Sequence, residues 1–434
     1  MDAWAILGAF IAALVVFLST GTPVAISMGL IGAVGLAFFV SWPAVGQLAN
    51  IAFTEASHFI LIVVPLFVFM GEVLARSGLG ETLFTAARLW LRRLPGASAL
   101  GTVAACTTFA SVSGSSPVTA ATVGSFAVQE MVRQGYQRRL ALGVTAAGGT
   151  LGILIPPSIP MILYGVMTET SIASLFIAGI LPGLMLAGLI SLTVIVMVLR
   201  DPSIAPADPN RAPLSEKLAA LGRLWPVMLL ILGVIGSIYA GVATPSEAAA
   251  VGALGAVAIA AWQRRLSFRV LGEALDASVR TTAMFLLLLI CGLLVTFLLA
   301  RLGVPQELAR TLTSLPVEPW LVMVAILALL IVLGFFMDPL SILVIVVPIF
   351  FPAVTAFGYH PVWFGIVVTI TIEIAAITPP VGFNLFVLRS VVPGASMGEV
   401  TRGAAIFVVP MLAGLLLLFL VPEIALSLVP ERVR

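Results

Sequence analysis

Long apolar runs recur along this chain of 434 residues, and they limit what it can fold into. Runs of about 17 to 25 mostly apolar residues have the length of a helix that crosses the hydrocarbon core of a bilayer. Hydrophobic residues make up 61% of the chain and charged residues 9%, whereas about 25% of the residues in a typical soluble domain are charged. Because lipid offers no hydrogen bonds to the backbone, such segments must be helical. The sequence therefore predicts an all-α polytopic membrane protein.

The apolar runs fall into full crossings and interrupted stretches. Ten runs have the features of full crossings, at about 4–19, 24–40, 58–75, 139–168, 172–199, 225–242, 246–262, 281–300, 361–390 and 403–421. Two others, at about 96–131 and 319–357, contain turn residues near the middle, at Ser113–Pro117 and Asp338–Pro339. Turns at membrane depth are tolerated only where protein or water surrounds them. We therefore predict two re-entrant helical hairpins.

Basic residues favour this topology. If each hairpin returns the chain to its starting side, 17 of the 21 basic residues, including Arg211, lie on one side of the membrane. The other four are Arg301, Arg310, Arg432 and Arg434. Since positively charged loops stay in the cytoplasm, both termini are predicted to be periplasmic. The small net charge of +2 argues against a nucleic-acid partner.

A short amphipathic segment precedes each hairpin. Leu83, Trp90 and Leu94 share one helical face in the first segment. The second has an apolar stripe at Val304, Leu308, Leu312 and Leu315. Helices of this kind lie along the membrane surface, and the alternative is a helix in a solvent-facing loop.

The two halves of the chain repeat the same motifs in the same order. Pro117 returns as Pro339 after 222 positions, and Pro156-Pro157 returns as Pro379-Pro380 after 223. By the charge count the halves have opposite orientations, which is typical of alternating-access transporters. We predict N-terminal scaffold helices in 1–57 and a first inverted repeat in 58–200. A connecting loop and scaffold helix follow in 201–245, and the second inverted repeat occupies 246–434.

Each half also contains a long crossing that a proline pair breaks at its centre. Two consecutive prolines remove two backbone donors and disfavour helix at the preceding residue. Carbonyl groups freed in this way suit a sodium ion, since hard cations bind several oxygen ligands. The helices that start after the hairpin tips and the breaks direct their positive N-terminal ends to the same depth, which suits a carboxylate. We therefore predict two discontinuous transmembrane helices beside the binding sites.

Oxygen-bearing residues near these turns form two candidate sets. For sodium we select Ser113, Gly114, Ser115, Ile155, Pro156, Thr378, Pro379 and Gly382. For substrate we select Ser116, Thr119, Ser158, Asp338 and Asn384. Asp338 could line the site or cap the helix that follows it. Glu373, deep in a crossing, could hydrogen-bond to a neighbouring helix or carry a coupled proton.

Three segments resemble a known family. They are SVSGSSPVTAATVGSF, GGTLGILIPPSIPMILYG and ITPPVGFNLF, which begin at Ser111, Gly148 and Ile377. They are similar to the large membrane subunit of the tripartite ATP-independent periplasmic transporters. The resemblance implies an elevator-type transporter in the bacterial inner membrane. It also implies uptake of a small organic anion, such as a C4-dicarboxylate or a sugar acid, coupled to sodium at two or more sites.

The same resemblance implies two protein partners, a small four-helix membrane subunit and a periplasmic substrate-binding protein. The alternative is a stand-alone sodium- or proton-coupled carboxylate symporter that needs no binding protein. The sequence contains no HExxH zinc site and no GxSxG elbow, so an enzyme is disfavoured. It has no GxxxxGK[ST] loop either, which disfavours an ATP-driven pump. The residues alone do not exclude a channel as the alternative, because re-entrant loops also build ion filters.

Overall fold

The computed structural model describes residues 3–206, 213–380 and 382–430. Every regular element in these ranges is a helix. Arg211, Arg432 and Arg434, which entered the charge count, lie outside the described residues, as does Val381 of the second break.

The first half of the chain runs to the end of a long helix at Arg200. Its elements are α1 (Ala3–Ser19), α2 (Val24–Gly35), the π-helical turn η1 (Leu36–Val40), η2 (Trp42–Gly46), α3 (Gln47–Ala56), η3 (Phe59–Ile62), α4 (Val63–Arg76), α5 (Leu79–Leu91), α6 (Ala97–Ser113), α7 (Ser116–Arg133), α8 (Arg138–Thr150), η4 (Leu151–Ile153), α9 (Ile159–Thr168) and α10 (Ile172–Arg200).

A short turn, η5 (Pro202–Ile204), precedes the second half. The remaining elements are α11 (Leu214–Tyr239), α12 (Pro245–Trp262), α13 (Phe268–Arg301), α14 (Val304–Ser314), α15 (Pro319–Gly334), α16 (Pro339–Ala356), α17 (Pro361–Ala376), α18 (Phe383–Val391), α19 (Met397–Leu420) and α20 (Glu423–Leu426). From α4 to α10 and from α13 to α19, hairpins and broken helices follow in the same order. The repeat boundaries and the inversion stay predictions.

Both predicted hairpins are pairs of packed helices. Gly114 and Ser115 join α6 to α7, and Gly114 adopts the left-handed conformation with φ +60° that glycine tolerates best. Residues 335–338 join α15 to α16, where the Asp338 side chain accepts hydrogen bonds from the backbone N–H groups of Leu340 and Ser341. Asp338 therefore caps α16, which is one of its two predicted roles.

Both predicted breaks are present as well. In the first, α8 and η4 end before Leu154, and α9 starts only after Ser158. In the second, α17 ends at Ala376 and α18 starts at Phe383. The proline pair lies inside each gap, as expected from residues that cannot donate to the preceding turn.

Several helices are longer than the apolar runs that predicted them. Helix α11 begins at Leu214, α13 at Phe268 and α19 at Met397, whereas the predicted membrane crossings begin at about 225, 281 and 403, so each helix extends beyond its predicted crossing. Polar helix surfaces explain the difference, because salt bridges along the start of α13 join Arg269 to Glu273 and Asp276 to Arg280 at 2.8 Å. Helix α3 was not predicted, since its composition is mixed.

Among the described residues, seven helices are long and apolar enough to cross a membrane. They include α10, α11, α12, α13 and α19, and also α16, the second arm of the second hairpin. The predicted crossings at 4–19 and 24–40 are shorter apolar helices, and so are α9 and α17, each one part of a broken crossing. Helix lengths thus agree with a multi-span membrane protein, whereas the re-entrant path of the hairpins stays a prediction.

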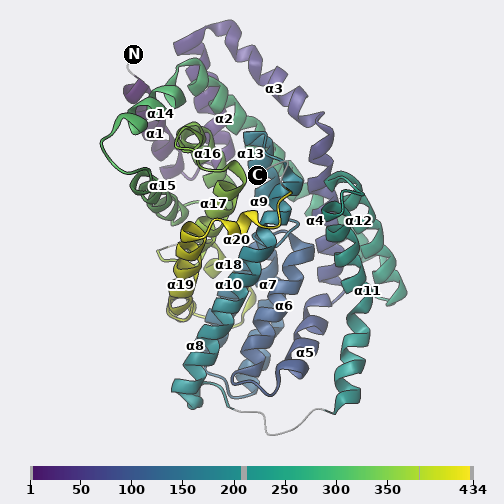
Figure 1. Cartoon of the computed structure of the whole chain (residues 1–434). Coiled ribbons are helices and arrows are strands. Elements are labelled where there is room, and N and C mark those ends of the chain that lie inside the picture. Colours follow the sequence, from purple (N-terminus) through teal and green to yellow (C-terminus); the bar gives the residue numbers. More distant parts are fainter. Residues whose placement is uncertain (1–2, 207–212, 381, 431–434) are drawn as a thin grey trace.

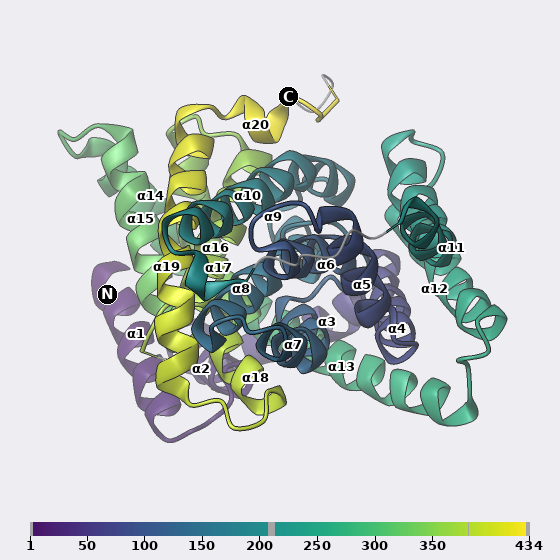
Figure 2. The ribbon, with the colours of Figure 1, turned by 90° about the horizontal axis from the view of Figure 1, so that it is seen from below.

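The helices form a broad assembly with the broken ones at its centre. Both views place α1, α14 and α15 at one side, α4, α11 and α12 at the other, and α6, α8, α9, α10 and α17 between them (Figures 1 and 2). Helix α13 connects the sides, since it packs against α2, α4 and α16. The amphipathic α5 packs against α6 and buries Leu83, while Trp90 stays 44% exposed. Helices from both halves of the chain therefore lie in the centre of the assembly.

The predicted topology can be tested by labelling. Cysteines introduced near Pro95 and Arg138, in a background without Cys106 and Cys291, should react only with reagent on the cytoplasmic side. The reason is that a re-entrant hairpin returns the chain to the side from which it entered. Labelling of the two positions from opposite sides would show that α6 and α7 together cross the membrane once.

Candidate functional site

The tip of the first hairpin is a cluster of buried hydroxyl groups. The hydroxyls of Ser113 and Thr119 are 2.7 Å apart and share a hydrogen bond. Thr119 Oγ1 also lies 2.9 Å from the Ser115 carbonyl oxygen, to which it donates. Ser113 and Thr119 are at most 4% exposed. The structure therefore brings together three residues that the sequence assigned to different sets, two to sodium and one to substrate.

This tip touches the first break directly. The backbone N–H of Ile159 donates to the Gly114 carbonyl at 3.3 Å. A methyl group on Gly114 would lie 2.8 Å from the Pro157 carbonyl oxygen. A methyl group on Gly152 would lie only 2.5 Å from the Ser115 carbonyl oxygen. Both glycines are thus required for the close approach of two backbone segments. Residues about 40 positions apart in the chain are therefore in direct backbone contact.

Oxygen atoms at the first break are available for a ligand. No donor among the described residues hydrogen-bonds to the carbonyl oxygen of Ile155 or Pro156. The Ser158 hydroxyl accepts a hydrogen bond from the Met161 N–H at 3.3 Å and so caps α9. Buried carbonyls normally have a partner. Carbonyl and hydroxyl oxygens are the types of ligand that a hard cation prefers.

At the second break the predicted residues lie in different environments. The Thr378 hydroxyl donates to the Ile374 carbonyl at 2.5 Å and is half-buried. Pro379 is exposed. Gly382 is left-handed with φ +60° and precedes α18. Asn384, in the first turn of α18, is fully buried. Asn384 is linked to the first hairpin through Glu373, to which Ser116 also donates.

Glu373 joins the two halves of the site. Its side chain is 1% exposed and lies in α17. The Ser116 hydroxyl donates to Glu373 Oε1 at 2.5 Å, and the Asn384 amide lies 3.5 Å from Oε2, at the limit of a hydrogen bond. Of the two roles predicted for Glu373, the hydrogen bond to another helix is present. Glu373 was selected from the sequence because it is an ionisable residue deep in an apolar run.

Two predicted substrate residues differ in their surroundings. Asn384 Oδ1 is buried and has no hydrogen-bond partner among the described residues. An unmatched buried acceptor indicates a ligand or water in the working protein. Asp338 instead directs its carboxylate to the N-terminus of α16, and its hydrogen bonds to described residues are all local, with Leu340 and Ser341. Glu373 links Ser116 to Asn384, whereas no hydrogen bond among the described residues joins Asp338 to either of them.

A multi-span helical fold with buried polar groups at paired helix breaks defines a polytopic membrane transport protein. Comparison with known families identifies the particular group. Residues 11–424 match the family described as "Tripartite ATP-independent periplasmic transporter, DctM component". The chain belongs to this family, which confirms the resemblance found in the sequence.

Individual relatives agree with this assignment. The C4-dicarboxylate TRAP transporter large permease protein DctM of Pseudomonas aeruginosa is 38% identical over 93% of both chains. The isethionate TRAP transporter permease protein DctMQ of Oleidesulfovibrio alaskensis is 34% identical, over 94% of this chain and 64% of the longer relative. Both are named as transport proteins, so the chain is a permease and not an enzyme.

One solved structure shows that the fold has a precedent. The YdaH transporter of Alcanivorax borkumensis superimposes with a TM-score of 0.64 and covers 90% of this chain and 91% of its own. The sequence identity is 16%, so this likeness concerns the fold alone.

Proposed function

We propose that this chain is the large permease subunit of a sodium-coupled secondary transporter in the bacterial inner membrane. It takes up a small organic anion that a periplasmic binding protein delivers. The observation that carries the proposal is the direct contact between the first hairpin tip and the first break, where the carbonyls of Ile155 and Pro156 have no donor among the described residues. Sodium is transported cargo here, and oxygen ligands of this kind suit it.

The substrate site lies next to the proposed sodium site. Helices α7 and α9 both begin at the contact between tip and break, at Ser116 and Ile159. Helix N-termini carry partial positive charge and exposed N–H groups, which attract a carboxylate or another anion. The unmatched Oδ1 atom of Asn384 adds an acceptor for a substrate hydroxyl. We therefore propose Ser116, Thr119, Ser158, Asp338 and Asn384 as substrate candidates, of which Asp338 also caps α16.

Members of the family are named for different substrates. The two relatives are named for a C4-dicarboxylate and for isethionate, although they are 38% and 34% identical to this chain. Relatives of similar identity therefore differ in substrate. A C4-dicarboxylate or sugar acid stays the proposed class, and a ligand screen of the cognate binding protein would identify the compound.

Two partners follow from the tripartite family. The chain spans 64% of the relative named DctMQ, which leaves room there for a second component. We infer that a separate small membrane subunit of four helices supplies this component here. The periplasmic binding protein is the other partner.

The apolar contacts of the first break with α4 and α11 are compatible with an elevator movement of the central helices. Pro156 and Pro157 turn an apolar surface to Phe67 of α4 and to Val234 and Ile238 of α11. Apolar contacts between helices carry no directional bonds that would resist sliding. In this proposal the hairpins and broken helices move together against α4 and α11.

Removing one oxygen ligand at each break should weaken sodium binding. Ser115→Ala and Thr378→Ala should each raise the sodium concentration for half-maximal uptake about five- to a hundredfold. The reason is that an unmatched polar partner costs about 1–3 kcal/mol. Sodium-dependent uptake is measured in proteoliposomes that contain all three components. Ser191→Ala, on the uninterrupted helix α10, is the control. Unchanged sodium dependence in both variants would contradict the paired sites.

A further inference from the structure

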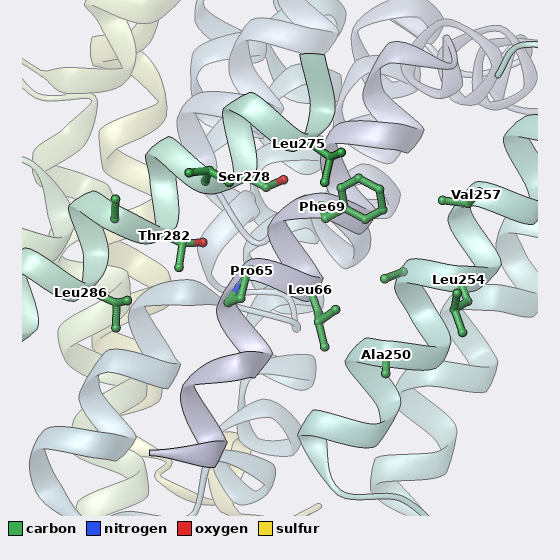
Figure 3. A pocket seen from close by; sticks show the side chains of 13 residues that line it. Pro65, Leu66, Phe69, Ala250, Leu254, Val257, Leu275, Ser278, Thr282 and Leu286 are labelled. Carbon is green, nitrogen blue, oxygen red and sulfur yellow. The ribbon is translucent and has the colours of Figure 1, made fainter. Parts of the chain in front are cut away.

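A deep apolar groove lies on the other side of the molecule from α1 and α15. It is a cavity of about 620 Å³ between α4, α12 and α13. Leu66 and Phe69 of α4, Leu254 of α12 and Leu275 and Leu286 of α13 line it, as Figure 3 shows. Leu254 is 73% exposed. The groove is therefore open at the surface of the helix assembly.

One polar atom in the groove has no partner. Thr282 Oγ1 is buried and makes no hydrogen bond to a described residue. Other hydroxyls on α13 donate to the carbonyl one turn earlier, as Ser278 does to Ala274 at 2.6 Å and Thr296 to Gly292 at 3.0 Å. An unmatched hydroxyl in an apolar groove indicates that the occupant brings an acceptor.

Basic residues surround one end of the groove. The guanidinium of Arg76, at the end of α4, lies 3.4 Å from the Glu273 carbonyl, so the end of α4 adjoins the start of α13. Arg265, just after α12, donates to the Ser77 carbonyl at 2.6 Å. Within the described parts of the chain, Arg264 and Arg265 have no salt bridge. The acidic residues nearby are already paired, Glu72 with Arg76, Glu273 with Arg269 and Asp276 with Arg280.

Along α13 the groove passes from the basic end to Leu275 and Ser278, then to Thr282 and finally to Leu286. The unmatched hydroxyl therefore lies partway along an apolar channel that has positive charge at one end. Helix α13 has 34 residues, whereas about 20 suffice to cross the hydrocarbon core. Its charged first part therefore belongs at the membrane surface, which puts Leu275 to Thr282 near the level of the lipid ester groups. We propose that the groove binds one anionic phospholipid. An acyl chain fills the cavity, an ester carbonyl accepts from Thr282, and the phosphate lies near Arg264 and Arg265.

Native mass spectrometry of the purified full-length chain tests this proposal. The protein is titrated with phosphatidylglycerol or with phosphatidylcholine of the same acyl chains. We expect one phosphatidylglycerol to bind about tenfold more tightly than phosphatidylcholine, because two arginines without a salt bridge to a described residue attract the extra negative charge. Thr282→Val, which keeps the shape and removes the hydroxyl, should weaken binding about fivefold.

Two further variants make the test specific. Ala250→Phe fills the groove and should abolish the tight binding, whereas Thr281→Val, next to the groove on α13, should leave it unchanged. If Ala250→Phe does not fold, Thr282→Val decides alone. Equal binding of the two lipids, or unchanged binding by Thr282→Val, would overturn the proposal. So would quantitative cross-linking of a cysteine at Leu254 to another membrane polypeptide, because a protein helix would then occupy the groove.

Discussion

Replacing Glu373 with leucine is expected to abolish uptake. Glu373 is buried and accepts from Ser116 and Asn384, so leucine leaves both donors unmatched in the protein interior. Each unmatched buried group costs about 1–3 kcal/mol. Two such groups together shift the equilibrium between the intact site and a rearranged site by at least about 30-fold. Uptake of substrate in the complete reconstituted system is the measurement, with surface expression and thermal stability recorded alongside.

Glutamine is the matched variant for this experiment. Its carbonyl oxygen can accept from Ser116, and its amide group can bond to Asn384 after the asparagine amide turns over. We therefore expect Glu373→Gln to keep most of the uptake and the pH profile of the wild type. If Glu373→Gln is as inactive as the leucine variant, or loses a pH dependence that the wild type shows, then the carboxyl group carries a coupled proton.

Substituting Gly152 with alanine should also inactivate the protein. The added methyl group would lie 2.5 Å from the Ser115 carbonyl oxygen and 2.7 Å from the Cα atom of Ser116. Both are backbone atoms of the hairpin tip, so the tip must move away from the break. Overpacking of this kind typically costs about 1–3 kcal/mol. Thermal unfolding in detergent should therefore occur at a lower temperature, and uptake should fall with it.

Gly188→Ala is the control for that variant. Gly188 lies within α10, and an added methyl group would meet no atom within 4 Å. Alanine has the higher helix propensity, by up to about 1 kcal/mol, so this change should leave stability equal or raised. Wild-type stability and uptake in Gly152→Ala would show that the tip and the first break do not pack as described.

Local chemistry accounts for the part of the fold that could be predicted from the sequence. Glycine, serine and proline at 113–117 and the proline pairs at 156–157 and 379–380 act within a few residues, so the hairpin tip and both breaks were found at the right places. The capping role of Asp338 is equally local, since its acceptors bond to backbone N–H groups two and three residues away.

The contact between Ser116 and Glu373 could not be predicted. These residues are 257 positions apart, and no local pattern relates the tip of the first hairpin to a helix of the second half. The repeat relates that tip to Asp338-Pro339 instead, which is why Asp338 was assigned to the same substrate set. Helix α3 was missed for another reason. Its composition is mixed, so no long apolar run marks it, and it packs against α13.

The central claim is that a sodium gradient drives uptake through this subunit. The most direct measurement is accumulation of labelled substrate in proteoliposomes that contain this chain, the small membrane subunit and the binding protein, at equal pH on both sides and with the membrane potential clamped. The account predicts that an inward sodium gradient concentrates substrate above its outside level, and that the chain alone does not. Equal accumulation without sodium, or mere equilibration of substrate in its presence, would contradict it.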